Sequence, residues 1–170
     1  AYCSENRASE GILPDMNIRE NLTSAILPQL CKGGVIQKGR QTKLTEGYIK
    51  EMNIKTPSQE QAIKYLSGGN QQKVILSKWI CMKPRFIILD EPTRGIDVGA
   101  KAEIEKIIQK LAEEGIAILF ISSELDELIR NCDRIIVIRD GQKMGELSNS
   151  EECTEERILR LIARGNGEQN

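Results

Sequence analysis

The sequence has no histidine among its 170 residues, and aromatic residues make up only 4% of it. Its cysteines are scattered and no two form a Cys-x-x-Cys pair; they are Cys3, Cys31, Cys81, Cys132 and Cys153. Because structural zinc sites use histidine or closely spaced cysteines, we expect no zinc site. Single scattered thiols are typical of proteins in a reducing compartment.

Long apolar segments and a strong net charge are also missing. The longest unbroken apolar run, 116–121, is far shorter than the roughly 20 residues that span a bilayer. The chain begins with no basic segment followed by an apolar one, so no secretory signal is expected. A formal net charge of −1 provides no basic surface for nucleic acid. Any membrane association is therefore expected to run through another subunit.

The second half of the sequence alternates between strand and helix patterns. Apolar strands are predicted at 86–89, 116–121 and 134–138, and helices at 99–113, 124–131 and 155–163. Strands that are apolar on both faces indicate a parallel sheet covered by helices. The predicted fold class is therefore α/β.

The first half is predicted to be mainly helical. Asn17 and Glu20 have capping-box spacing, and Pro28 is expected to break or bend the helix that follows. Further helices are predicted at 44–52 and 70–82. We therefore divide the chain into a helical part with the helix 70–82 (1–83), an α/β core (84–164) and a disordered tail (165–170).

The stretch 66–73, Leu-Ser-Gly-Gly-Asn-Gln-Gln-Lys, is predicted to be a turn of small residues that opens a helix. Backbone N–H groups and the positive end of a helix can hold phosphate oxygens. A plain helix cap at Ser67 is the alternative interpretation of these residues.

The strand 86–89 is followed directly by two carboxylates, Asp90 and Glu91. Carboxylates at the end of a buried strand can support Mg²⁺ and polarise an attacking water. The alternative is that both residues begin a solvated loop.

In this order, the two stretches resemble the signature and Walker B motifs of ABC-type ATPases. The signature stretch, with Asn70 where glutamine is usual, is similar to that of sugar importers of the ribose, galactose and xylose type. Residues 90–101 and the Ser-Ser-Glu stretch 122–124 share this resemblance, which covers about 2–163. It implies a P-loop NTPase core of the ABC type with an α-helical subdomain.

The resemblance also implies roles for individual residues. Asp90 would support Mg²⁺ and Glu91 would be the general base. Contacts with nucleotide would come from the signature, the D-loop and the Q-loop, namely Ser67, Gly68, Gly69, Asn70, Gln71, Asp97 and Glu5. Glu5 replaces the usual Q-loop glutamine, and Ser123 replaces the switch histidine of the family, which puts hydrolysis at this domain's own nucleotide site in doubt. Asp97 could equally cap the next helix, and Glu5 could be a solvated charge.

No stretch of the sequence fits Gly-x-x-x-x-Gly-Lys-[Ser/Thr], so the P-loop is absent. The sequence therefore looks like the C-terminal part of a second ATPase domain, and we expect it to be inactive alone. In such proteins, the P-loop strand lies between the strands that resemble 116–121 and 134–138. We expect the chain either to shift its last strand inward or to dimerise.

The implied function is ATP-driven carbohydrate import at the cytoplasmic face of the membrane, with ATP and Mg²⁺ as cofactors. The first implied partner is a companion ATPase domain, to whose site this chain would contribute the signature motif in trans. The others are permease subunits, which would contact residues 18–82, and, indirectly, a sugar-binding protein. Nucleic acid is not among the implied partners. One alternative is a non-catalytic module that pairs with another ATPase domain and a permease. Another is a soluble ABC protein that acts in translation or DNA repair.

Overall fold

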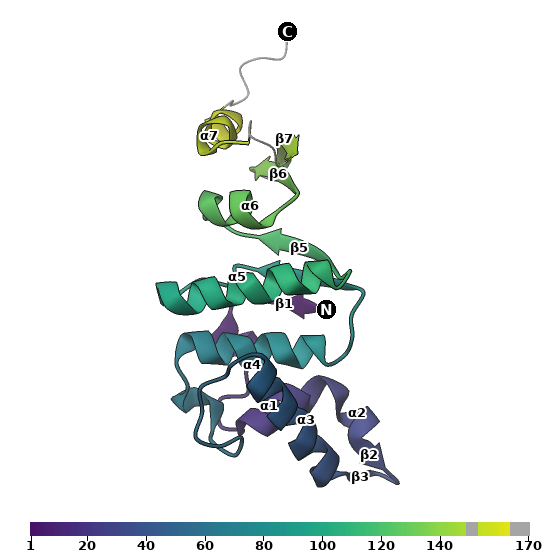
Figure 1. Ribbon diagram of the computed structural model, residues 1–170. Coiled ribbons are helices and arrows are strands. Elements are labelled where there is room, and N and C mark those ends of the chain that lie inside the picture. The colour runs from purple at the N-terminus through teal and green to yellow at the C-terminus, as the bar shows by residue number, and fades with distance from the viewer. Residues whose placement is uncertain (149–152, 164–170) are drawn as a thin grey trace. The chain divides into compact units, whose positions relative to one another are not determined.

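The computed structural model describes residues 1–148 and 153–163, which divide into two compact units, Ala1–Leu119 and Phe120–Asn170 (Figure 1). Unit 1 contains helical turns at Arg7–Gly11, Ser24–Ile26 and Ile63–Tyr65 and the elements β1 (Tyr2–Cys3), α1 (Ile18–Thr23), α2 (Leu27–Leu30), β2 (Cys31–Lys32), β3 (Val35–Ile36), α3 (Lys38–Glu51), α4 (Gly68–Ile80), β4 (Phe86–Asp90) and α5 (Val98–Glu113). Strand β5 (Ala117–Ile121) crosses the boundary, and unit 2 contains α6 (Leu125–Asn131), β6 (Arg134–Arg139), β7 (Gln142–Ser148) and α7 (Glu155–Ala163). The predicted tail 165–170 lies outside the described residues.

The helices of unit 1 follow the sequence signals with two corrections. The capping box is confirmed: the Asn17 side chain accepts from the Glu20 N–H at 2.8 Å, and the Glu20 carboxylate accepts from the Asn17 N–H at 3.1 Å. The helix is interrupted as expected near Pro28, but earlier in the chain: α1 ends at Thr23, and Pro28 lies in the first turn of α2, where its missing N–H costs nothing. Helix α3 begins at Lys38 rather than at residue 44; its first turns were missed because they are polar and show no apolar period.

The parallel sheet is confirmed in unit 1. Its strand order is β1-β4-β5, and β1 runs parallel to β4 with Tyr2 opposite Ile88 and Cys3 opposite Leu89. Ile87 and Leu89, which share one face of β4, are 1% and 0% exposed, whereas Phe86 on the other face is 47% exposed. One face of β4 is therefore fully buried and the other is only partly covered. Helices α4 and α5 lie alongside each other, and α4 also contacts α1 and β1 (Figure 1). The start of α4 and the end of β4 therefore belong to one packed body.

The last predicted strand pairs differently from expectation. Strand β6 is antiparallel to β7, in a two-stranded sheet of its own. The turn between them, Asp140 and Gly141, has φ angles of 51° and 74°, the left-handed pair that suits tight hairpins. Strand β7 was not predicted because its residues are mostly polar. Among the described strands, β5 ends the three-stranded sheet, so an inward shift of the last strand is not observed, and dimerisation stays a prediction.

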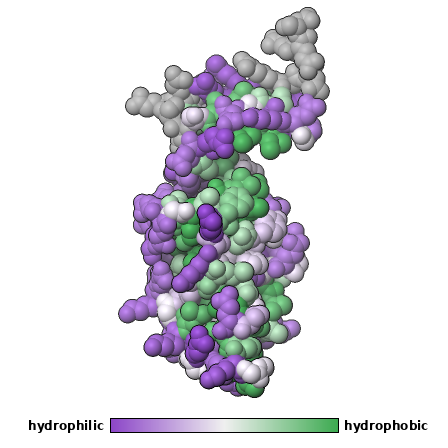
Figure 2. Space-filling view, turned by 90° about the vertical axis from the view of Figure 1, so that its right-hand side faces the viewer, coloured by the Kyte–Doolittle hydropathy of each residue, from purple (hydrophilic) through white to green (hydrophobic). Residues whose placement is uncertain are grey.

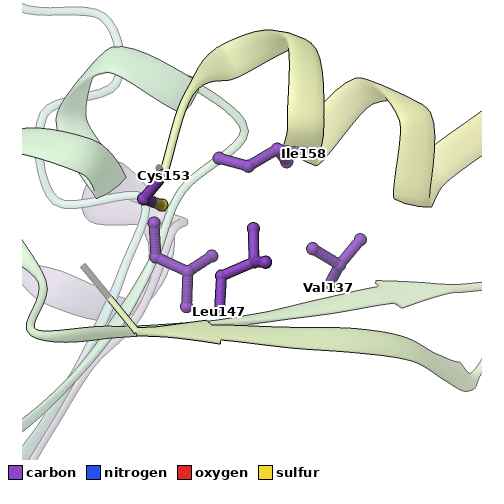
Figure 3. Close-up of a cluster of buried hydrophobic side chains, with 5 residues drawn as sticks. Val137, Leu147, Cys153 and Ile158 are labelled. Carbon is purple, nitrogen blue, oxygen red and sulfur yellow. The ribbon is translucent and has the colours of Figure 1, made fainter. Parts of the chain in front are cut away.

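Unit 2 has a small hydrophobic core between its hairpin and α7 (Figure 3). The buried side chains come from both strands, from α7 and from Cys153 shortly before α7; they are Ile135, Val137, Leu147, Cys153 and Ile158. Ile158 is 1% exposed and points from α7 toward the hairpin, as Figure 3 shows. This contact gives the amphipathic helix α7 a fixed place on the hairpin.

Hydrophobic side chains also reach the surface of unit 1. Val98 is 84% exposed and Tyr65 is 69% exposed, and the face shown in Figure 2 mixes hydrophobic with hydrophilic residues. Within the part of the chain that the structure describes, no helix has the length and apolar character that crossing a membrane requires.

Candidate functional site

The predicted phosphate-binding turn lies at the N-terminus of α4. Ser67 is the N-cap residue, with an extended backbone (φ −61°, ψ 156°), and it is exposed. Its side chain makes no capping hydrogen bond to the helix backbone; instead its Oγ accepts from Asn70 Nδ2 at 2.9 Å. The plain-cap interpretation of Ser67 therefore does not describe its side chain. The positive end of α4 has no hydroxyl cap.

Gly69 is needed for close packing inside unit 1, and Gly68 also lies close to neighbouring groups. A Cβ atom on Gly68 would lie 3.0 Å from Arg7 Nη2 and 3.4 Å from the Gly95 carbonyl oxygen. A Cβ atom on the buried Gly69 would lie only 2.4 Å from Ala100 Cβ. The structure shows that neighbouring protein groups come close to both glycines; their predicted contact with a phosphate stays a prediction.

The two residues that follow are turned toward the protein. Gln71 Nε2 donates to the carbonyl oxygens of Ile63 and Leu66, both at 3.2 Å. Asn70 Oδ1 accepts from the backbone N–H of Lys55 at 2.8 Å. Both side chains therefore fasten α4 to the segment that leads into it, and their predicted contacts with nucleotide remain predictions.

Asp90 and Glu91 lie at the carboxyl end of β4 and are both half-buried. The Tyr2 hydroxyl on the neighbouring strand donates to Asp90 Oδ2 at 3.0 Å, and this hydrogen bond raises the pKa of the Tyr2 phenol. Glu91 has a φ angle of 45°, in the left-handed region that a residue with a Cβ rarely adopts. Asn53, Lys83 and Asp140 have similar φ angles, so this backbone conformation is not special to Glu91, and the role of Glu91 stays a prediction.

Glu5, the predicted Q-loop residue, meets Arg94 close to the start of α4. Glu5 forms an ion pair with Arg94, and Arg7 Nη1 donates to the Arg94 carbonyl oxygen at 3.5 Å. They border a hollow of about 300 Å³ lined by Glu5, Asn6, Arg7, Ala8, Ser9 and Arg94. The Glu5 charge is thus paired with Arg94. This ion pair does not decide between the contact with nucleotide and the solvated charge that the sequence left open.

Asp97 caps α5, since its Oδ1 accepts from the Ala100 N–H at 2.9 Å. This is the capping role that the sequence left open; a contact with nucleotide stays a prediction. Ser123 is exposed and belongs to unit 2, whereas Glu91 belongs to unit 1. Beside Ser123, Ser122 Oγ donates to the fully buried Glu127 at 2.9 Å, which ties this stretch to α6.

Three residues of this region were missed in the sequence. Tyr2 contacts Asp90, Arg7 contacts the signature turn, and Lys73 ties α4 to its neighbours. Only Lys73 had a signal, because it ends the signature stretch. Tyr2 is brought in by the pairing of β1 with β4 and Arg7 by the helical turn Arg7–Gly11, and residue spacing reveals neither.

The described residues also bear on metal binding. No group of three or more acidic or cysteine side chains that could hold a metal ion occurs among them. Mg²⁺ at nucleotide sites usually takes one or two carboxylates and completes its shell with water and phosphate oxygens. Asp90, half-buried at the end of β4, fits that pattern.

The sequence matches the ABC transporter family over residues 1–94. It is 46% identical over 165 residues to the ribose import ATP-binding protein RbsA of Bacillus cereus (strain ATCC 14579), a match that covers 97% of this chain and 33% of that protein. It is 47% identical over 150 residues to the galactofuranose transporter ATP-binding protein YtfR of Escherichia coli (strain K12), covering 88% and 30%. The chain thus spans about a third of the length of the curated relatives it matches.

A solved structure supports the fold. The chain resembles a dimeric ATP-binding cassette in a post-hydrolysis state, bound to ADP and Pi, with a TM-score of 0.71 and 21% identity over 88% of this chain and 62% of that one. The fold is that of an ABC ATPase core. Together with the family match over more than half of its residues, this shows that the chain belongs to the ABC transporter family.

Proposed function

We propose that the chain is part of the ATP-hydrolysing component of an ABC-type carbohydrate importer. The relatives named for ribose import and galactofuranose transport support this, at 46% and 47% identity. The observation that carries the proposal is the start of α4, where the uncapped helix end and the exposed Ser67 occur together. A helix end of this kind attracts an anion such as a phosphoryl group.

In this proposal the start of α4 acts in trans. The chain has no P-loop of its own, so a companion ATPase domain supplies one and holds the ATP. The Ser67 hydroxyl and the first amides of α4 then complete the site on the terminal phosphate. The predicted contacts of Gly68, Gly69, Asn70 and Gln71 with nucleotide belong to this arrangement, and by itself the chain does not turn over ATP.

The acidic pair would serve the nucleotide site of its own domain, whose P-loop is not among these 170 residues. Asp90 would hold Mg²⁺ together with phosphate oxygens, and the ion would neutralise charge on the phosphates. Glu91 would polarise the attacking water as general base. Ser123 occupies the switch position, where serine lacks the charge of histidine. Asp97 and Glu5 would border the nucleotide from the D-loop and Q-loop.

The proposed partners follow from the same family. A permease would dock on the helical part, residues 18–82. Closure of the paired ATPase domains on ATP would be transmitted through this contact to the permease and would drive transport. A sugar-binding protein would act through the permease. The chain would therefore be peripheral at the cytoplasmic face of a membrane. The domain division at residues 83 and 84 is proposed on the same basis.

The test compares Ser67→Ala with Ser148→Ala in the assembled complex that contains this chain. Ser148 is also exposed, and it lies at the end of β7, outside the residues proposed to contact nucleotide or permease. We expect Ser67→Ala to lower ATP turnover about 10- to 100-fold, the range for a hydrogen bond to a charged group, and Ser148→Ala to leave it unchanged. Equal turnover in both variants would contradict the proposal.

A second measurement separates the catalytic proposal from a non-catalytic module. We expect Glu91→Gln to retain ATP binding in the complex and to lose hydrolysis at the site that it serves. In isothermal titration, the isolated chain is expected to show no tight ATP binding. Hydrolysis that is insensitive to Glu91→Gln would favour a chain that only supplies its signature motif to a partner.

A further inference from the structure

The side chain of Asn70 joins two groups that lie on opposite sides of it. Its Oδ1 accepts from the backbone N–H of Lys55 at 2.8 Å, and its Nδ2 donates to Ser67 Oγ at 2.9 Å. The orientation of the amide is determined by the first contact, because a backbone N–H can only donate and must face the oxygen. Nδ2 is therefore directed at Ser67.

This contact decides what the Ser67 hydroxyl can do. A hydroxyl has one hydrogen to donate, and Ser67 Oγ acts as acceptor toward Asn70. In the part of the chain that is described, that hydrogen has no acceptor, and the side chain does not cap α4. Because Ser67 is exposed, the hydrogen is available to a group that approaches from outside.

The segment that holds Asn70 is itself anchored. Lys73, one turn further along α4, is 2% exposed; its Nζ donates to the Asn53 carbonyl oxygen at 3.0 Å and forms an ion pair with Glu103 of α5. The stretch from Asn53 to Lys55 is thus held by two side chains of α4. The Lys55 N–H is a stable donor, so the orientation of Asn70 follows from the fold.

We propose that Asn70 is a positioning residue that holds the Ser67 hydroxyl as a hydrogen-bond donor toward a phosphate oxygen of the bound nucleotide. The inference rests on the proposed function, since it needs a phosphoryl group in front of Ser67. It differs from the predicted direct contact between Asn70 and nucleotide, because here Asn70 acts through Ser67. The short asparagine side chain suits this position, where it spans Ser67 and Lys55 at once.

The test is a double-mutant cycle with Ser67→Ala and Asn70→Ala, measured as kcat and KM for ATP in the assembled complex that contains this chain. We expect Ser67→Ala to lower kcat/KM about 10- to 100-fold and Asn70→Ala about 5- to 10-fold. The double variant is expected to match Ser67→Ala, because Asn70 then has nothing left to orient. Thermal unfolding of each variant shows that it is folded.

The outcomes separate the two proposals. If Ser67→Ala leaves kcat/KM unchanged, the proposed function fails. If Ser67→Ala lowers it but the two effects multiply in the double variant, the proposed function stands and Asn70 acts independently of Ser67, which overturns the inference. An Asn70→Ala variant with normal kcat/KM would overturn it as well.

Asn70→Asp provides a second, structure-based measurement. Its carboxylate still accepts from the Lys55 N–H but cannot donate to Ser67. In the chain itself we expect the Lys55 amide to stay protected from hydrogen exchange in Asn70→Asp and to exchange faster in Asn70→Ala. In the complex, Asn70→Asp should nevertheless lose turnover as Asn70→Ala does. Normal turnover in Asn70→Asp would show that the donor to Ser67 is dispensable and would overturn the inference.

Discussion

Gly69 of α4 approaches Ala100 of α5 so closely that a Cβ atom added to Gly69 would lie 2.4 Å from the Ala100 Cβ. Real Cβ atoms do not come this near, and the obstructing atom is a methyl group that cannot rotate away. The second glycine of the signature motif is therefore required by helix packing, and this packing places the start of α4 next to the Asp97 cap of α5.

We expect Gly69→Ala to lower the free energy of unfolding by about 1–3 kcal/mol, the usual cost of overpacking a tight contact. This happens although alanine is the better helix former. The measurement is urea unfolding of the variant and of the unchanged chain.

Gly47→Ala is the matched control. Gly47 is exposed in the middle of α3, and a Cβ atom there meets nothing within 4 Å. This substitution is expected to stabilise the chain by up to about 1 kcal/mol through helix propensity. Equal gains for Gly69→Ala and Gly47→Ala would show that the contact with Ala100 relaxes freely. Adding Ala100→Gly to Gly69→Ala should recover part of the loss.

The core of unit 2 depends on Ile158. Because this side chain is 1% exposed among apolar neighbours from β6 and β7, Ile158→Ala is expected to cost about 2–5 kcal/mol. Leu159→Ala removes a similar side chain from the next position of α7, where it is 52% exposed, and should change stability by less than about 0.5 kcal/mol. Thermal unfolding, monitored by a signal from unit 2, measures the stability change of both variants. Similar losses in the two variants would mean that α7 does not pack as described.

Stability should decrease in acid because two carboxylates are paired. The hydrogen bond from Lys73 lowers the pKa of Glu103, and that from Arg19 lowers the pKa of Glu60, both from an ordinary value of 4.5. Each group then binds its proton more weakly in the folded chain, so its stabilisation is complete above about pH 4.5 and is lost as the pH falls through the lowered value. We expect the Tm to drop over this range.

The Glu103→Gln and Glu60→Gln variants should show a smaller acid-induced drop in Tm. Glu113→Gln removes one charge from an exposed position of α5 and controls for net charge. If all three variants follow the unchanged chain from pH 7 to pH 3, the two ion pairs do not contribute.

Three cysteines should react slowly with alkylating reagents. Burial raises the pKa of the Cys3, Cys81 and Cys132 thiols to about 11 from 9.0. Since the thiolate is the nucleophile, we expect their alkylation by iodoacetamide at pH 8 to be about 100-fold slower in the folded chain than in denaturant. Mass spectrometry of labelled peptides measures each rate. Labelling that is equally fast in both conditions would show that these thiols are not buried in solution.

Much of the local structure was predictable from the sequence because its causes lie within a few residues. The capping box at Asn17 and Glu20, the apolar strand that becomes β4 and the apolar period of α5 each depend on neighbours in the chain. The order of the signature and acidic stretches was sufficient to indicate the family that the comparison then showed. These features are determined by backbone geometry and side-chain spacing alone.

The roles of the site residues depended on tertiary contacts. Gly69 faces Ala100, Asn70 is held by Lys55, and Tyr2 reaches Asp90 only because β1 and β4 pair in parallel. The antiparallel pairing of β6 with β7 was likewise missed, since apolar content does not specify a partner strand. Sequence patterns report which groups are present and how they are spaced, whereas the contacts that orient them join residues distant in the chain and form only when helices and strands pack together.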